Sequence, residues 1–204
     1  MRPTPHLSAL ILLVVPSLAT TAQSVGRSGL GIKAGVQWCT LLAPDLVYSP
    51  TPGGIAGIYL PLHAGARFEL QPELLLSYQG ADAHRTDSEA IPLRMLYIHV
   101  PVSAKIFLTN AFNLQGGLQA GKCMSATAAD VSIMDDIRPF DVGFLAGLGL
   151  DMRSGFDLTA RYYGGTTPVL AHDNGVNPRH RLLQLTAGYR VMRLSHRRHR
   201  SHKG

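Results

Sequence analysis

The sequence has 204 residues, enough for one domain, with 19 Lys and Arg against 13 Asp and Glu. Six of the cations lie at the chain ends: Arg2, Arg193, Arg197, Arg198, Arg200 and Lys203. The body is therefore close to neutral, which excludes a uniformly basic nucleic-acid-binding domain. Residues 193–204 are interpreted as a disordered basic tail, and phosphate contact by this tail is the alternative.

The first 22 residues have the order of a secretory signal peptide. Arg2 supplies the positive start, Leu7–Val15 is apolar apart from Ser8, and small residues precede Gln23. This apolar stretch is shorter than the roughly 20 residues that a membrane-spanning helix needs. We expect residues 1–22 to be removed on export, with a retained anchor as the alternative.

The mature part, residues 23–192, alternates between apolar and polar residues with a period of two. Eight strands are predicted: Leu30–Thr40, Gly54–Leu62, Ala66–Gln79, Arg94–Leu108, Phe112–Ala126, Phe140–Met152, Phe156–Gly164 and Arg181–Met192. In the last strand Leu183, Leu185 and Tyr189 share one face, and Gln184 and Arg190 share the other. The pattern indicates an all-β fold.

The connections between these strands alternate in length. Residues 63–65, 110–111 and 153–155 form tight turns, whereas residues 41–53, 80–93, 127–139 and 165–180 form long connections. Short turns at one end and long loops at the other are typical of outer-membrane barrels. We therefore predict an eight-stranded antiparallel up-and-down transmembrane β-barrel in the bacterial outer membrane, with both termini periplasmic. A soluble exported β-sandwich or lipocalin-like carrier stays open as an alternative.

Aromatic residues on the apolar face fall into two rows under this arrangement. Trp38, Tyr78, Phe140 and Tyr162 are expected near the loops, and Phe68, Phe112, Phe156 and Tyr189 near the turns. Amphipathic rings prefer the headgroup level of a membrane, so two rows indicate two interfaces.

The opposite face is too charged for the core of a soluble protein. A structural lumenal network is predicted from Lys33, Arg67, Glu69, Glu73, Lys105, Asp141, Asp151, Arg161 and Arg190. Glu73 with Lys105 and Arg161 is the expected centre. Because side chains fill the interior of an eight-stranded barrel, we expect a closed plug rather than an ion pathway.

Pro72, Pro101 and both cysteines lie within the predicted strands. Pro72 and Pro101 each lack an N–H group, and bulges are expected there. Cys39 and Cys123 both point inward, from opposite walls. A disulfide needs Cα atoms within about 7 Å, so both are expected to stay free thiols.

Motifs in order along the chain resemble the PorT-type outer-membrane β-barrel family, a relative of OmpA-like and OmpX-like barrels. The resembling segments are 31–36, 70–75, 97–101, 112–117, 140–149, 160–162 and 184–190. The resemblance implies the barrel fold and an outer-membrane location but no common activity; a few members are linked to protein secretion and gliding. The chain departs from the family at His99, where an acid is frequent, and at Val191-Met192, where an aromatic residue usually ends the barrel.

The sequence shows no catalytic, cofactor or metal signature, so we expect no enzyme and no cofactor. The loop pairs His84 with Ser88 and His172 with Asp173 are the catalytic alternatives, and the tail histidines are a weak metal-binding alternative. The favoured function is a monomeric structural or interaction barrel. Its expected partners are outer-membrane lipid, the barrel-assembly machinery and proteins that bind its extracellular loops. The alternatives are a small channel or carrier for apolar ligands and an accessory barrel of a secretion system.

Overall fold

Eight long strands make up most of the computed structural model, which describes residues 28–42, 47–65, 67–84, 91–171 and 178–193. They are β1 (Gly29–Leu42), β2 (Val47–Tyr59), β4 (Phe68–His84), β5 (Ile91–Phe107), β6 (Phe112–Ala128), β8 (Phe140–Asp151), β9 (Phe156–Gly165) and β10 (Arg179–Arg193). The short elements are β3 (Leu62–Ala64), β7 (Val131–Ser132) and the 3-10 helix η2 (Met134–Asp136). No helix of the described residues has the length and apolar character needed to cross a membrane.

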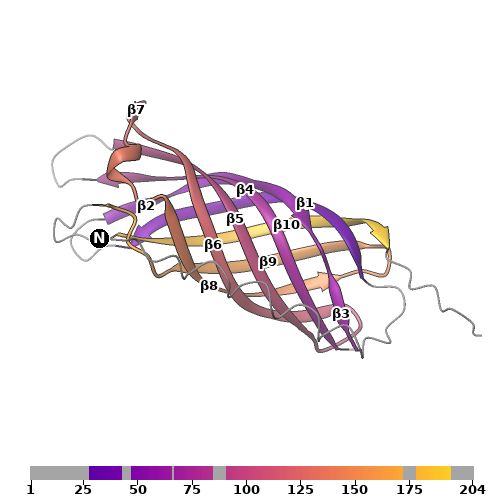
Figure 1. Ribbon diagram of the computed structural model, residues 1–204. Helices are drawn as coiled ribbons and strands as arrows, with labels where there is room; N and C mark the ends of the chain where they lie inside the picture. Colours follow the sequence, from indigo (N-terminus) through magenta and orange to yellow (C-terminus); the bar gives the residue numbers. More distant parts are fainter. Residues whose placement is uncertain (1–27, 43–46, 66, 85–90, 172–177, 194–204) are drawn as a thin grey trace, which may run out of the picture.

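The strands close into a ring (Figure 1). Their order is β2-β1-β10-β9-β8-β6-β5-β4, every pairing is antiparallel, and β2 pairs with β4 to complete the circle. The first and last strands pair from Gly29 opposite Arg193 to Leu42 opposite Arg179. Closure gives every strand two neighbours, which satisfies backbone groups that lipid cannot hydrogen-bond. The predicted eight-stranded barrel is confirmed.

The two ends of the barrel differ. The turn end carries residues 60–65, 108–111 and 152–155, and the loop end carries the described residues 129–139 and 166–171 (Figure 1). At the turn end Gly155 has φ +97°, a conformation that glycine adopts without strain, and its N–H donates to the carbonyl of Met152 at 3.0 Å. Gly29 and Arg193 also pair at this end, so the described chain begins and ends there.

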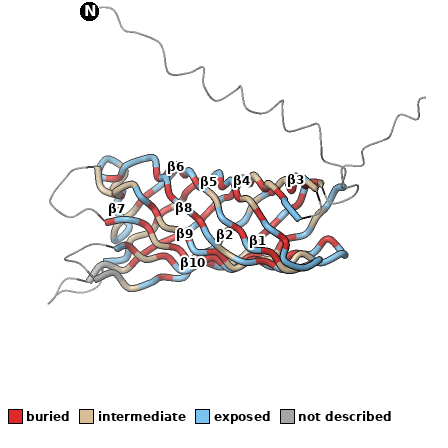
Figure 2. The backbone as a smooth tube through the Cα atoms, turned by 90° about the horizontal axis from the view of Figure 1, so that it is seen from below, coloured by how far each residue is buried: buried red, intermediate tan, exposed pale blue. Residues whose placement is uncertain are grey.

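Burial alternates along the long strands (Figure 2), and through most of the barrel the buried positions are polar and the exposed positions apolar. On β1 the side chains of Lys33, Gln37 and Cys39 are buried, whereas Ile32 and Val36 are at least half exposed. A soluble sandwich would have the reverse arrangement, so this alternative is excluded. Both predicted aromatic rows lie on the outside: Trp38 and Tyr162 are both opposite Leu183, and Tyr189 is opposite Phe156.

Several strands are longer at the loop end than the sequence predicted. Val47 pairs with His84 and Asp82 with Pro92, so the connections predicted at 41–53 and 80–93 are mostly strand. Prolines and glycines in β2 resemble loop composition, but pairing with β4 and β1 holds this segment extended. Arg193 belongs to β10 rather than to the predicted tail. Residues 1–22 and 194–204 lie outside the described residues.

The predicted bulges at Pro72 and Pro101 are wrong. The register between β4 and β5 is the same on both sides of the two prolines. Glu73 and Leu74 have no partner on β5, but pairing resumes at Leu75 without a shift. The carbonyl of Pro72 accepts a hydrogen bond from the N–H of Leu60 at 2.9 Å, where β2 gives way to β3. Register shifts occur instead at Leu30/Gly31, between Pro50 and Gly54, and at Leu96/Tyr97.

A substitution at Leu148 can test which face of the barrel meets lipid, because the Leu148 side chain is 49% exposed on the outside of β8. Leu148→Arg is expected to lower the free energy of unfolding by about 2–4 kcal/mol, since it would place a charge near the bilayer midplane. The matched control is Met152→Arg, at the turn end just after the same strand, where the cost should be about 0–1 kcal/mol. Urea titration of the barrel in lipid vesicles measures both, and equal costs would contradict the placement.

Candidate functional site: the lumenal charge network

One layer of buried charges crosses the lumen near the turn end. Glu69 on β4 lies between His63 and Lys105, with Oε2 at 2.9 Å from His63 Nε2 and Oε1 at 3.3 Å from Lys105 Nζ. Lys105 also lies 3.1 Å from Asp151 Oδ2, and the Asn113 amide donates to Asp151 Oδ1 at 2.9 Å. These contacts join four strands, β4, β5, β6 and β8, through the interior of the barrel.

A second layer lies closer to the middle of the barrel and is centred on Glu73. Arg161 on β9 holds its carboxylate with two parallel hydrogen bonds, 3.0 Å to Oε1 and 2.9 Å to Oε2. Lys33 on β1 adds a 3.0 Å ion pair, and the Gln71 amide donates to Oε1 at 2.6 Å. The three charged side chains are each at most 1% exposed, so the carboxylate and both cations depend on one another.

The period of two explains how these groups converge. Glu69, Gln71 and Glu73 are every second residue of β4 and all point inward. Glycine provides space at the crowded levels: a Cβ at Gly188 would lie 2.4 Å from Asp157 Oδ2, directly across from it on β9. Asp157 in turn accepts a short hydrogen bond from the Tyr59 hydroxyl.

Neutral polar groups fill the next level of the lumen. Gln37 donates to Ser77 Oγ at 2.6 Å and accepts from the Gln184 amide at 3.3 Å. Above them, the Tyr97 hydroxyl lies 3.2 Å from His180 Nε2, and the Tyr97 ring stacks on His99 with centroids 5.3 Å apart. Toward the loop end the lumen is thus filled mainly by neutral polar groups.

Apolar side chains gather inside the barrel at the loop end. Leu41, Ala81, Met95, Tyr97, Cys123, Ala126, Ile137 and Val169 form one buried cluster. Ile133, just before η2, and Met134, the first residue of η2, pack against it. The sequence analysis missed this cluster; its only signal was a set of apolar residues on inward positions of the strand ends.

The predicted network residues divide among several places. Lys33, Glu73 and Arg161 meet in one layer, and Glu69, Lys105 and Asp151 meet in the other. Lys105 does not contact Glu73 as expected, because the β4–β5 register sets it opposite Glu69. This part of the prediction is wrong.

Three other predicted members lie outside these two layers. Arg67 is exposed at the turn end, and Arg190 is half-buried at the same end. Asp141 is buried near the loop end, where it accepts a hydrogen bond from the Tyr163 hydroxyl at 2.8 Å. His63 and Asn113 were not predicted: the sequence placed His63 in a tight turn, whereas the inward position of Asn113 on its strand could have indicated it.

The two cysteines are free and buried, as predicted. Cys39 packs with Leu145, Tyr163 and Leu182, and its sulfur lies 3.9 Å from His180 Nδ1. Cys123 belongs to the apolar cluster at the loop end. Within the described ranges, no three His, Cys, Asp or Glu side chains are placed to hold a metal ion. Ser88, His172, Asp173 and the tail histidines lie outside those ranges, as does the side chain of His84.

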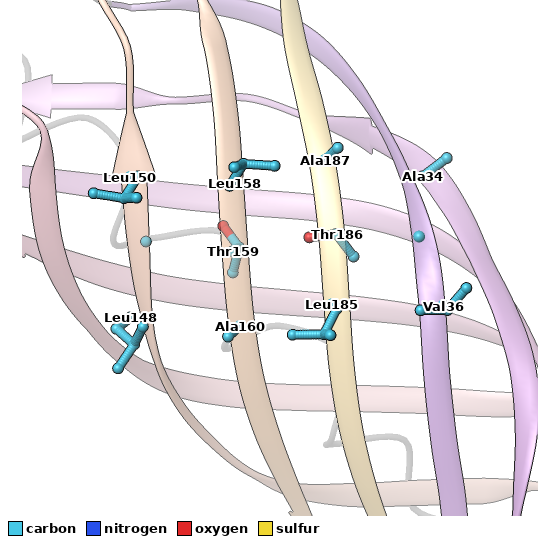
Figure 3. A pocket seen from close by; sticks show the side chains of 12 residues that line it. Ala34, Val36, Leu148, Leu150, Leu158, Thr159, Ala160, Leu185, Thr186 and Ala187 are labelled. Atoms are coloured by element: carbon cyan, nitrogen blue, oxygen red, sulfur yellow. The ribbon is translucent and has the colours of Figure 1, made fainter.

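The outer wall carries a shallow apolar hollow of about 460 Å³ (Figure 3). Ala34 and Ala187 are cross-strand neighbours, and Ala160 lies beside Leu185. These short side chains leave a depression among longer ones from β1, β8, β9 and β10. The hollow faces outward, so it belongs to the lipid-facing surface and not to the lumen.

Comparison with known proteins gives one family and a group of similar folds. The model of the outer membrane protein beta-barrel domain family matches residues 21–171. Neisserial surface protein A is 13% identical with a TM-score of 0.55, covering 80% of this chain and 97% of its own. OprG from Pseudomonas aeruginosa is 11% identical with a TM-score of 0.49, covering 84% and 98%. Ail, the attachment invasion locus protein of Yersinia pestis, is 16% identical with a TM-score of 0.49, covering 80% and 98%. No curated protein matches the sequence.

Glu73→Ala tests the network, because it would leave Lys33 and Arg161 buried without their shared counter-charge. We expect a loss of about 3–5 kcal/mol in the free energy of unfolding, measured by urea titration in detergent. The control is Asp82→Ala, which breaks the half-exposed pair with Arg94 and should cost about 0–1 kcal/mol. A loss at Glu73 no larger than at Asp82 would contradict a buried network.

Proposed function

Because the chain belongs to the outer membrane protein beta-barrel domain family, we propose that it is a closed, non-enzymatic barrel with a structural or interaction role. Its loop end faces the cell exterior, and both ends of its barrel domain face the periplasm. The observation that carries this proposal is the pair of buried charge layers across the lumen, centred on Glu69 and Glu73. The outward connections then offer the surface for partners, and the strands hold that surface in the membrane.

Three features together support a closed lumen. The Glu73 layer joins β1, β4 and β9, and the Glu69 layer joins β3, β4 and β5 and continues through Asp151 to β8. Arg161 is the largest of the fully buried side chains. The apolar cluster adds a dry layer at the loop end. An ion would have to break paired charges and then cross apolar packing.

A planar-bilayer recording tests closure. The wild-type barrel is expected to insert without discrete conductance steps, while a porin added to the same bilayers gives steps and shows that the assay works. Heat-modifiable gel migration of the same preparation shows that the barrel is folded. Steps of a fixed size from the folded wild-type chain would support a channel instead.

Thiol labelling of intact cells tests orientation. Val131→Cys places a thiol at the loop end, on a residue that is 67% exposed, and Ser154→Cys places one in an exposed turn at the other end. A membrane-impermeant maleimide is expected to label the first variant and not the second. The wild-type chain, with both thiols buried, is the background control. The reverse labelling pattern would invert the proposed topology.

A carrier for apolar ligands is the second candidate, favoured by the buried apolar cluster at the loop end. Such a ligand would have to displace that packing to enter the barrel. An accessory role in protein secretion rests on the resemblance to the PorT-type family, which is a finer assignment within the outer-membrane barrels. Recognition by the barrel-assembly machinery and a monomeric state belong to the same proposal.

A further inference from the structure

Four cations form an arc on the outside of the barrel at the loop end. Lys122 lies beside Phe140 across the β6–β8 pair, and Arg179 and Arg181 share the outward face of β10. Arg138 precedes β8, and its backbone N–H donates to the carbonyl of Val169. The N–H of Val169 donates in turn to the carbonyl of Pro178, the residue before Arg179. The arc therefore runs along one wall of the barrel, from β6 across β8 and β9 to β10.

None of these four cations makes an ion pair with a carboxylate of the described residues. The exposed acids of η2, Asp135 and Asp136, are near in sequence but are not paired with Arg138. Arg94, on the β4–β5 wall, differs in this respect: its guanidinium lies 3.2 Å from Asp82. Asp141 attracts Arg181 electrostatically without forming an ion pair with it. Among the described residues, the arc therefore keeps most of its positive charge unpaired.

Backbone carbonyls hold two of the arginine side chains in place. Arg138 donates through Nε to Leu170 at 2.9 Å, and Arg181 donates through one terminal nitrogen to Gly165 at 2.9 Å and to His180 at 3.0 Å. The other guanidinium nitrogens are left for an external acceptor. A fixed planar guanidinium matches the oxygens of a phosphate, and less side-chain entropy is lost on binding.

The depth of the arc identifies the kind of acceptor. The Lys122 ammonium lies 6.0 Å from the centroid of the Phe140 ring, which belongs to the aromatic row at the loop end. Arg181 is two residues from Leu183, the cross-strand neighbour of Trp38 in the same row. Aromatic rows mark the headgroup level, so the cations lie where lipid phosphates lie.

We propose that Lys122, Arg138, Arg179 and Arg181 bind the phosphates of anionic lipids and so gather such lipids against the β6–β8–β10 wall. This inference goes beyond the proposed function. It requires the barrel to span a membrane, but it requires neither a closed lumen nor exterior loops, so its failure and theirs are separate results.

Trp38 provides a built-in probe, because it is the chain's single tryptophan and lies outward beside Leu183. The barrel is reconstituted in phosphatidylcholine vesicles that contain an equal fraction of either bromine-labelled phosphatidic acid or bromine-labelled phosphatidylcholine. Bromine on the acyl chains quenches tryptophan fluorescence at contact. We expect stronger quenching by phosphatidic acid, with a preference that falls as salt rises. Equal quenching by the two lipids in the wild type would overturn the proposal.

Charge variants locate the preference. R179Q/R181Q should lower it by roughly fivefold for each arginine removed, the effect expected for a cation at an anionic lipid surface. R94Q, which removes a cation already paired with Asp82, should leave it unchanged. R181K should recover part of what R181Q loses, and heat-modifiable migration shows that each variant is folded. An unchanged preference in R179Q/R181Q, or its loss in R94Q, would overturn the proposal.

A last arm separates lipid from soluble anion. Inorganic phosphate, compared with chloride at equal ionic strength, should leave the lipid preference intact, because several headgroups meet the arc at once and their local concentration is high. Abolition of the preference by free phosphate would show a site for a soluble anion and would overturn the lipid assignment.

Discussion

Backbone N–H and C=O groups in lipid cannot hydrogen-bond to water, so they must pair within the protein. In this chain the pairing of β1 with β10 closes the sheet and satisfies that requirement. Closure has a consequence for the side chains. Because strands alternate, the apolar face that lipid requires turns the polar face into a confined interior. Charges there must then be balanced within the protein, and the layers around Glu69 and Glu73 provide that balance. The ion pairs of the lumen thus follow from the sealed backbone of the wall.

The fold was accessible from the sequence because period two and connection length are both local properties. Each of the eight predicted strands exists, and inward position correctly identified most buried charges. Partners were less accessible. Glu73 was matched with Lys105, but register depends on how two whole strands align, and that alignment set Lys105 opposite Glu69. The prolines misled for a related reason: a missing N–H interrupts a ladder locally, and the neighbouring pairs of β4 and β5 still fixed the register.

The loop end was the least predictable part. Pro50, Pro52 and Gly53 look like loop residues, yet pairing holds them extended: Pro50 pairs with β4, and Pro52 and Gly53 pair with β1. The apolar cluster draws Ile137 and Val169 from connections, whose burial has no periodic signal. The sequence pattern therefore predicted the middle of the barrel correctly, because each strand there alternates between the lumen and the lipid. It did not predict the loop end, where side chains from strands and connections pack in one core.

The barrel uses charge in two different ways, and solvation separates them. Arg161 is buried, so it is stable only beside a fixed counter-charge, which Glu73 supplies with two hydrogen bonds. Arg181 lies at the rim, where water and headgroups solvate it, and the carbonyls of Gly165 and His180 orient its guanidinium. A cation of the first kind joins strands to one another. A cation of the second kind keeps its charge available to the surroundings, so the wall between β6 and β10 differs from the wall where Arg94 is already paired with Asp82. In a membrane of mixed lipids, this difference gives an otherwise uniform cylinder a preferred side.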